Sequence, residues 1–264
     1  MNKSDFYKSL RRRGSGVFGT SLSQAQVNGV EAIIADCQKH GADLGQAAYI
    51  LATAYGETGG KMRPVRENMN YSAKRIPQVF SAKRRQGIPA SKLAGNPQLL
   101  ANTVYGGPWG EANLGNRIGT NDGWVFRGFW IGQITGYHNA TKWSAGLGVD
   151  LIGNPKLLDD PALAVKGLVL PMLEGWATGK SLHQFVSGSK RNFVGARAVW
   201  NGSFEAEKYA RYARAFEVAL TEAGYTYAEA RGTVAPETPS TPPAAGILAA
   251  IIAFIAALTG KATK

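Results

Sequence analysis

Residues 44–60, LGQAAYILATAYGETGG, join an apolar helical pattern to an acidic side chain. Apolar residues recur there at intervals of three and four, which places them on one face of a helix: Leu44, Ala47, Ala48, Leu51, Ala54 and Tyr55. Thr58 and two glycines follow, and glycine commonly ends a helix because its backbone reaches the left-handed region at low cost. The pattern therefore predicts a helix over 44–57 that ends at Glu57.

Helical patterns also dominate the sequence on both sides of this stretch. Residues 23–26 are typical of a capping box, and apolar residues follow at helical spacing up to Gly41. Cys37 lies on that apolar face, so we expect a small core residue rather than a nucleophile. Further helices are expected near 72–80, 96–104, 160–174, 181–187, 191–200 and 205–223.

Two features interrupt the helical pattern. Pro171 is expected to end or kink the helix over 160–174. Short strands are expected at 124–126 and 130–134, inside a stretch rich in glycine, tryptophan and asparagine. The sequence therefore predicts a mainly α fold with a small irregular or β element, in one domain over 1–231.

The composition of the chain excludes several classes of protein. Hydrophobic residues make up 44% of the 264, so the chain is not disordered throughout. A single cysteine excludes disulfide scaffolds and Cys-rich zinc modules. The three histidines, His40, His138 and His183, lie far apart in sequence, so we expect no metal site and no cofactor.

The charge of the chain favours anionic partners. The net charge is +12, which suits nucleic acid, anionic lipid or an acidic cell wall, although a basic protein need not have such a partner. The basic clusters at 11–13 and 83–85 are short. We interpret them as solvated surface and expect no nucleic-acid partner.

The C-terminal residues differ in composition from the rest. Residues 232–243 are rich in proline, threonine and serine and are predicted to form a linker. Residues 244–260 carry no charge and reach about 25 Å as a helix, slightly less than a bilayer core of about 30 Å. We expect a membrane-inserting or membrane-lying helix. The alternative is a core or oligomerisation helix that packs through its alanines.

The N-terminal residues carry charges without a following apolar region, so we expect no signal peptide. We expect synthesis in the cytoplasm.

Glu57 is the first candidate for catalysis. The C-terminal end of a helix disfavours negative charge, and the neighbouring alanine and tyrosine predict a partly apolar wall. Both effects favour the protonated carboxyl that a general acid needs near neutral pH. The alternative is a solvated glutamate near a helix end.

Glu67 follows ten positions later and is the second candidate. A loop between them can bring the two carboxyls several ångströms apart, and inverting glycosidases need about 6.5–9.5 Å for a water molecule. Arg63 and Arg66 are expected to keep Glu67 ionised, which suits a general base. The alternative is a surface glutamate paired with one of these arginines.

Residues 127–139 mix aromatic rings with amides and hydroxyls, as sugar-binding sites commonly do. Gln133 and Thr135 are polar candidates there. Asn201, before Gly202, is a further polar candidate whose alternative role is a simple turn.

Five short motifs occur in an order that resembles the family 19 glycoside hydrolases. They are Glu-Thr-Gly-Gly at 57–60, Glu-Asn-Met-Asn-Tyr-Ser-Ala at 67–73, Asp-Gly-Trp-Val-Phe-Arg-Gly at 122–128, Gln-Ile-Thr-Gly-Tyr-His-Asn at 133–139 and Asn-Gly at 201–202. The similarity covers about residues 15–222 and is closer to the lysozyme-like phage endolysins of that family.

The resemblance implies a mostly helical, lysozyme-like fold and an inverting, metal-free hydrolysis. It places the acid on Glu57 and the base on Glu67. It implies substrate contacts by six further residues, of which Thr135 would also help to hold the attacking water: Tyr71, Ser72, Gln133, Thr135, Asn139 and Asn201.

The sequence departs from the family pattern at a few positions. Phe129 and Trp130 stand where the family usually has arginine and glycine. Tyr137 and Ala140 replace a usual arginine and tyrosine, and Tyr55 stands where histidine is common. Both candidate carboxylates are present, so we expect activity.

The leading hypothesis is a phage or prophage enzyme that cleaves peptidoglycan between N-acetylated sugars. It would act in the periplasm or cell wall, reach it through a holin-type lesion or with a virion, and associate with a membrane through residues 244–260. The alternatives are a chitinase and a non-catalytic virion or membrane protein that retains the fold for wall binding.

Overall fold

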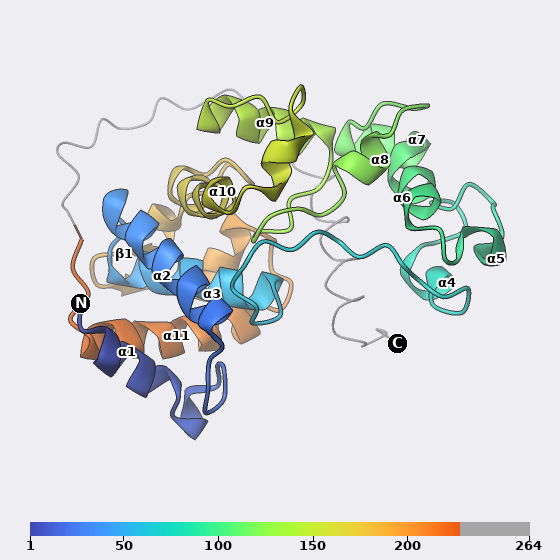
Figure 1. The fold of residues 1–264 in the computed structure, drawn as a ribbon. Coiled ribbons are helices and arrows are strands. Elements are labelled where there is room, and N and C mark those ends of the chain that lie inside the picture. The colour runs from blue at the N-terminus through green and yellow to red at the C-terminus, as the bar shows by residue number, and fades with distance from the viewer. Residues whose placement is uncertain (228–264) are drawn as a thin grey trace. The chain divides into compact units, whose positions relative to one another are not determined.

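Helices make up most of the computed structural model, which describes residues 1–227. The described residues divide into two units, one from 1–63 and 161–227 and the other from 64–160. Figure 1 shows the helices of both units. The mainly α class predicted from the sequence is confirmed.

The first unit contains five helices, three 3-10 turns and one short hairpin among its described residues. The helices are α1 (Lys3–Leu10), α2 (Gln24–Lys39), α3 (Leu44–Glu57), α10 (Pro161–Glu174) and α11 (Ala206–Glu222). The 3-10 turns are Arg13–Ser15, Leu182–Gln184 and Gly195–Val199. Strands β1 (Val186–Ser187) and β2 (Lys190–Arg191) pair antiparallel.

Helix α3 is the centre of this unit. Its residues from 45 to 54 are all buried, and it packs against α2, α10, α11 and β1. Asp43 and Gln46 form a capping box at its start. A Cβ on Gly56 would lie 2.3 Å from the ring of Tyr209, so glycine lets α11 approach the end of α3. The helix has the bounds predicted from residues 44–60.

Several other predicted helices are confirmed. The capping box of α2 is present at Ser23, Cys37 is fully buried, and burial raises the pKa of its thiol. Helix α6 (Pro97–Gly106) and α11 also match their predicted positions. Pro171 does not end α10, which continues to Glu174 with its buried face packed against α2 and α3, while the kink given as the other possibility stays a prediction.

Other local predictions are wrong. Only Ile76–Val79 is helical (α4) within 72–80, while 181–187 and 191–200 contain 3-10 turns and the hairpin. The strand expected at 124–126 is instead the end of α8 (Asp122–Val125), and 130–134 is a tight turn with one bridge between Phe129 and Ile134. These segments are short, so tertiary contacts outweigh their local propensity.

The second unit packs around α6. Its remaining helical elements are α5 (Ala90–Leu93), α7 (Pro108–Leu114), α9 (Tyr137–Leu147) and a 3-10 turn, Pro155–Asp159. Leu100, Val104 and Tyr105 of α6 share a core with Phe80 and Leu114. Asp122 accepts hydrogen bonds from the backbone and the guanidinium of Arg117, which fixes the segment before α8. This core and these hydrogen bonds hold the backbone that carries the polar side chains of the unit.

The predicted linker at 232–243 and the hydrophobic helix at 244–260 lie outside the described residues. Within residues 1–227, no helix is both long enough and apolar enough to cross a bilayer.

Candidate active site

Glu57 lies at the last position of α3 and is buried in an ion pair. The Nη2 of Arg197 lies 2.9 Å from its Oε1, and neither side chain is exposed to solvent. The hydroxyl of Tyr209 donates to the same oxygen at 3.0 Å. The guanidinium of Arg197 also stacks on the Tyr209 ring, 3.6 Å from its centroid. Residues from three separate segments thus meet at one carboxylate.

The electrostatic effect of this cluster is visible in its two partners. Burial is the largest single effect and acts to lower the pKa of Arg197, but attraction to Glu57, Tyr209 and Tyr49 together outweighs it and the pKa is raised. Burial raises the pKa of Tyr209, and the negative charge of Glu57 raises it further. The partly apolar wall predicted around Glu57 is therefore wrong in an essential respect, since a buried cation faces the carboxyl.

Several buried polar atoms without partners belong to the same unit as this ion pair, and the Asn201 backbone N–H donates to the Arg197 carbonyl at 2.9 Å. Asn201 is fully buried, and neither its Oδ1 nor its Nδ2 has a hydrogen-bond partner among the described residues. The same holds for Oε2 of Glu57 and the hydroxyl of Tyr49. Buried polar groups normally have partners, so these atoms mark a place where water or a ligand can bind. Asn201 sits in the turn after Gly195–Val199, yet its side chain points inward.

Glu67 belongs to the second unit and lies on an extended segment beside residues 128–130. Its backbone N–H donates to the Gly128 carbonyl at 2.8 Å, and Gly128 N–H donates to Oε2 at 3.2 Å. The hydroxyl of Tyr105 donates to Oε1 at 2.8 Å. A Cβ on Gly128 would lie 3.1 Å from Cβ of Glu67, so glycine permits this close approach.

Burial raises the pKa of Glu67, although several groups act in the opposite direction. The hydrogen bonds from Tyr105 and Gly128 lower it, as do the positive charges of Arg84 and Arg127. Glu67 is therefore not the surface glutamate of the alternative, and neither arginine named from the sequence forms an ion pair with it among the described residues. Arg66 donates instead to the Val125 carbonyl and faces Asp159, and Arg63 belongs to the other unit.

Gln133 ties a strained turn to the segment that carries Glu67. Its Nε2 donates to the carbonyls of Val65 at 2.7 Å and Trp130 at 3.0 Å, while its buried Oε1 has no partner among residues 1–227. Gln133 and Trp130 both have positive φ, 53° and 60°. Trp130 stands where the family usually has glycine, and the left-handed backbone gives the physical reason for that glycine.

The other predicted contact residues lie in the same unit. Thr135 donates to the Gln133 carbonyl at 3.3 Å, and Asn139 donates to the Thr135 carbonyl at 2.8 Å. Tyr71 is half-buried with its ring against Phe80, and exposed Ser72 accepts from the Arg75 backbone.

The structure thus gathers the candidates into two groups, one in each unit. Glu57 lies with Asn201, and Glu67 lies with Gln133, while their mutual separation stays a prediction. Arg197, Tyr209, Tyr105 and Arg84 were not predicted. The available signal for Tyr209 was a hydroxyl-bearing ring at helical spacing within the predicted helix over 205–223. Residues 1–227 contain no cluster of His, Cys, Asp or Glu suited to a metal ion.

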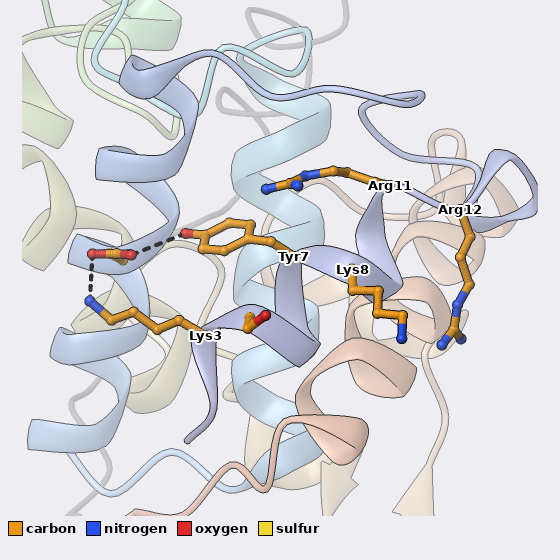
Figure 2. Close-up of a pocket in the computed structure, with 7 residues that line it drawn as sticks. Lys3, Tyr7, Lys8, Arg11 and Arg12 are labelled. Carbon is orange, nitrogen blue, oxygen red and sulfur yellow. Dashed lines mark hydrogen bonds and ion pairs between the residues drawn. The ribbon is translucent and has the colours of Figure 1, made fainter.

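A basic hollow lies along α1 in the first unit. We define it by its lining, which Figure 2 draws: Lys3, Ser4, Tyr7, Lys8, Arg11, Arg12 and Glu31. Lys3 pairs with Glu31 at 2.9 Å, and Arg12 pairs with Glu222 at 2.7 Å. Lys8 and Arg11 form no ion pair with any described residue. The hollow therefore presents positive charge to solvent.

Comparisons with known proteins bear on these groups. No family model matches the chain. Over 132 residues the chain is 35% identical to a glycosyl hydrolase family 19 domain-containing protein of Haemophilus influenzae. The chain resembles family 19 glycoside hydrolases. The aligned part is 47% of this chain, and it spans 61% of the relative's length. The resemblance drawn from the five motifs is thereby confirmed.

A solved structure also aligns with the chain. The crystal structure of a chitinase C mutant has 17% sequence identity and a TM-score of 0.41, covering 86% of this chain and 93% of that chain. Agreement at this level does not establish a common fold.

Removing Arg197 tests the buried ion pair. Arg197→Met leaves the Glu57 carboxylate buried without its cation, so the free energy of unfolding at neutral pH should fall by about 3–5 kcal/mol. Adding Glu57→Gln should recover part of that loss, because a neutral amide needs no cation. Urea unfolding followed by circular dichroism measures both. Arg12→Met, at the surface pair with Glu222, should change the free energy of unfolding little. A loss as large as that in Arg197→Met would contradict the prediction.

Glu67→Gln tests the cost of burying this carboxyl. Because the folded pKa is raised, ionisation of Glu67 destabilises the fold as the pH rises above the unfolded value of about 4.3. The substitution should therefore raise the melting temperature at pH 8 and give no gain at pH 4. The exposed Glu111→Gln serves as the control. A rise in the melting temperature that occurs only at pH 4 would contradict the prediction.

Proposed function

We propose that the chain is a glycoside hydrolase that cleaves β-1,4 bonds between N-acetylated sugars of peptidoglycan. The observation that carries this proposal is a pair of buried acidic side chains, Glu57 and Glu67, each held by specific donors and each in a motif of the family that the chain resembles. Buried carboxyls of this kind perform general acid–base chemistry on glycosidic bonds.

The proposed reaction inverts the anomeric centre. Glu57 donates a proton to the leaving glycosidic oxygen, and Glu67 removes a proton from the water that attacks the opposite face. The raised pKa of Glu67 supports a role in proton transfer, because it lies closer to neutral pH than the pKa of an ordinary glutamate. The Glu57 carboxyl that would supply the proton to the leaving oxygen is held by Arg197 and Tyr209.

Substrate contacts are proposed at the residues implied by the family motifs. The partnerless Oε1 of Gln133 suits a sugar hydroxyl or an N-acetyl N–H, and the partnerless amide of Asn201 can both donate and accept. Thr135 and Asn139 are linked to Gln133 by successive hydrogen bonds to backbone carbonyls. Tyr71 offers an aromatic face, and Ser72 is its neighbour in the sequence.

We propose that the reaction serves the lysis of a host cell by a phage. Made in the cytoplasm, the enzyme reaches the periplasm and cell wall through a holin-type lesion or with a virion. Residues 244–260 associate with the membrane next to the wall. The basic hollow on α1 supports an anionic surface as the partner, since Lys8 and Arg11 there form no ion pair with a described residue.

The catalytic assignment is tested with Glu57→Gln and Glu67→Gln in the full-length chain. Each should reduce the release of reducing ends from purified sacculi by about 10²–10⁴-fold, because each removes a proton donor or acceptor. Glu111→Gln is the matched control, an exposed glutamate that should leave the rate unchanged.

Each other outcome of this assay identifies an alternative. Undiminished release by either variant would exclude that carboxyl from the chemistry. Faster turnover of chitin oligomers than of sacculi would favour a chitinase. Binding to sacculi without any reducing ends from the wild type would favour a non-catalytic wall-binding protein.

The basic hollow is tested separately with vesicles that contain phosphatidylglycerol. Lys8→Glu combined with Arg11→Glu should weaken binding about tenfold or more at low salt, because both cations face anionic headgroups. Lys180→Glu together with Lys92→Glu gives the same change in net charge at other exposed positions. Equal weakening by both pairs would assign the effect to net charge and exclude the hollow as the contact.

A further inference from the structure

Arg84 occupies an aromatic enclosure in the second unit. It lies in the turn-rich segment between α4 and α5, and its guanidinium carbon is 4.0 Å from the ring centroid of Trp109. The rings of Phe80 and Tyr105 lie at 5.0 and 5.2 Å. Gln86 anchors this segment to α6 by donating to the Thr103 carbonyl at 2.8 Å. The position of the cation is therefore set by packing on three sides.

The guanidinium of Arg84 has no conventional partner. Its Nε and Nη2 are buried without a hydrogen bond, and it forms no ion pair with any residue from 1 to 227. Arg84 as a whole is half-buried, and burying two guanidinium nitrogens without hydrogen bonds costs free energy that stacking on aromatic faces partly offsets. The contacts that hold this guanidinium in place are therefore those with the aromatic rings.

The nearest element that connects Arg84 to chemistry is Tyr105. One face of its ring is in contact with the guanidinium, and its hydroxyl donates to Oε1 of Glu67 at 2.8 Å. Phe80 packs edge-on against the same ring, with centroids 6.1 Å apart. Arg84 and Phe80 together restrict the ring plane, and that plane determines where the hydroxyl meets the carboxyl.

We infer that Arg84 is a positioning residue for Glu67: it fixes Tyr105 against the carboxyl and stabilises the negative charge there through space. The effect on hydrolysis rests on the proposed function, in which Glu67 is the general base. The effect on the charge of Glu67 does not depend on that function.

Several other groups also face Glu67. Tyr105 and the Gly128 N–H donate to it, and Tyr71, Arg66 and Arg127 interact with it electrostatically. The guanidinium of Arg127 is itself held by hydrogen bonds to the carbonyls of Glu67 and Trp124. Arg84 differs because no hydrogen bond of its guanidinium explains its position, which leaves the electrostatic role as its distinct contribution.

Arg84→Met separates charge from packing, because methionine keeps an unbranched stem among the rings and removes the cation. In the full-length chain, the side-chain carboxyl of Glu67 is followed by carbon-13 NMR and assigned by its loss in Glu67→Gln. We expect Glu67 to titrate at higher pH in Arg84→Met than in the wild type. The acid limb of the pH–rate profile should also move to higher pH. The activity at the acidic end of that limb should fall about tenfold relative to the activity on the plateau.

Lys83→Met is the matched control, because it removes the same charge from the exposed neighbouring position. It should leave both the titration and the profile unchanged. Arg84→Lys keeps a cation that cannot lie flat among the rings, so it should give a smaller shift in the same direction. This variant carries the test if Arg84→Met does not fold.

The possible results separate the two claims. If Glu67 titrates in folded Arg84→Met at the same pH as in the wild type, the inference is overturned. If only Arg84→Lys folds, the same result in that variant overturns it. A shift in Lys83→Met equal to the shift in the Arg84 variant also overturns it. If Glu67 shifts as expected while the wild type releases no reducing ends, the positioning role stands and the proposed function fails.

Discussion

A carboxyl removed from water must find partners, and this requirement organises the first unit. Glu57 ends α3 in the interior, where Arg197 and Tyr209 meet it. Arg197 comes from the 3-10 turn and Tyr209 from α11, so one acidic group joins three segments that are far apart in sequence. Gly56 makes the junction sterically feasible, because any side chain there would collide with the Tyr209 ring. Breaking the pair leaves a lone buried charge, the costly case for a protein interior.

The second unit buries its acid differently. Glu67 has no cation within an ion pair and relies on the Tyr105 hydroxyl and the Gly128 N–H. Burial then dominates and raises its pKa, whereas two more distant arginines limit the rise. Each carboxyl therefore has its own electrostatic environment, one next to a cation and one next to neutral donors. Acid–base catalysis by two carboxyls depends on such unequal surroundings.

Backbone strain is concentrated beside Glu67. Trp130 and Gln133 adopt left-handed conformations in the turn that faces the Glu67 segment, and strain of this kind persists only where the surroundings hold it. The Gln133 amide supplies that restraint through Val65 and Trp130. Placing the bulky indole of Trp130 at a position suited to glycine is compatible with the fold because the ring is fully buried. The strained turn and the buried acid thus form one local structure.

The sequence by itself determined the long helices and the positions of the acidic residues. The 44–57 pattern and the capping box at Ser23 are local features, so spacing and cap chemistry were sufficient to place α3 and α2. Only the tertiary structure decided what surrounds each carboxyl. Arg197 and Tyr105 lie 140 and 38 positions from the acids they contact, and no periodicity links residues over such distances. The burial that raises the pKa of Glu67 likewise arises only when α6 and the 127–134 segment close around it.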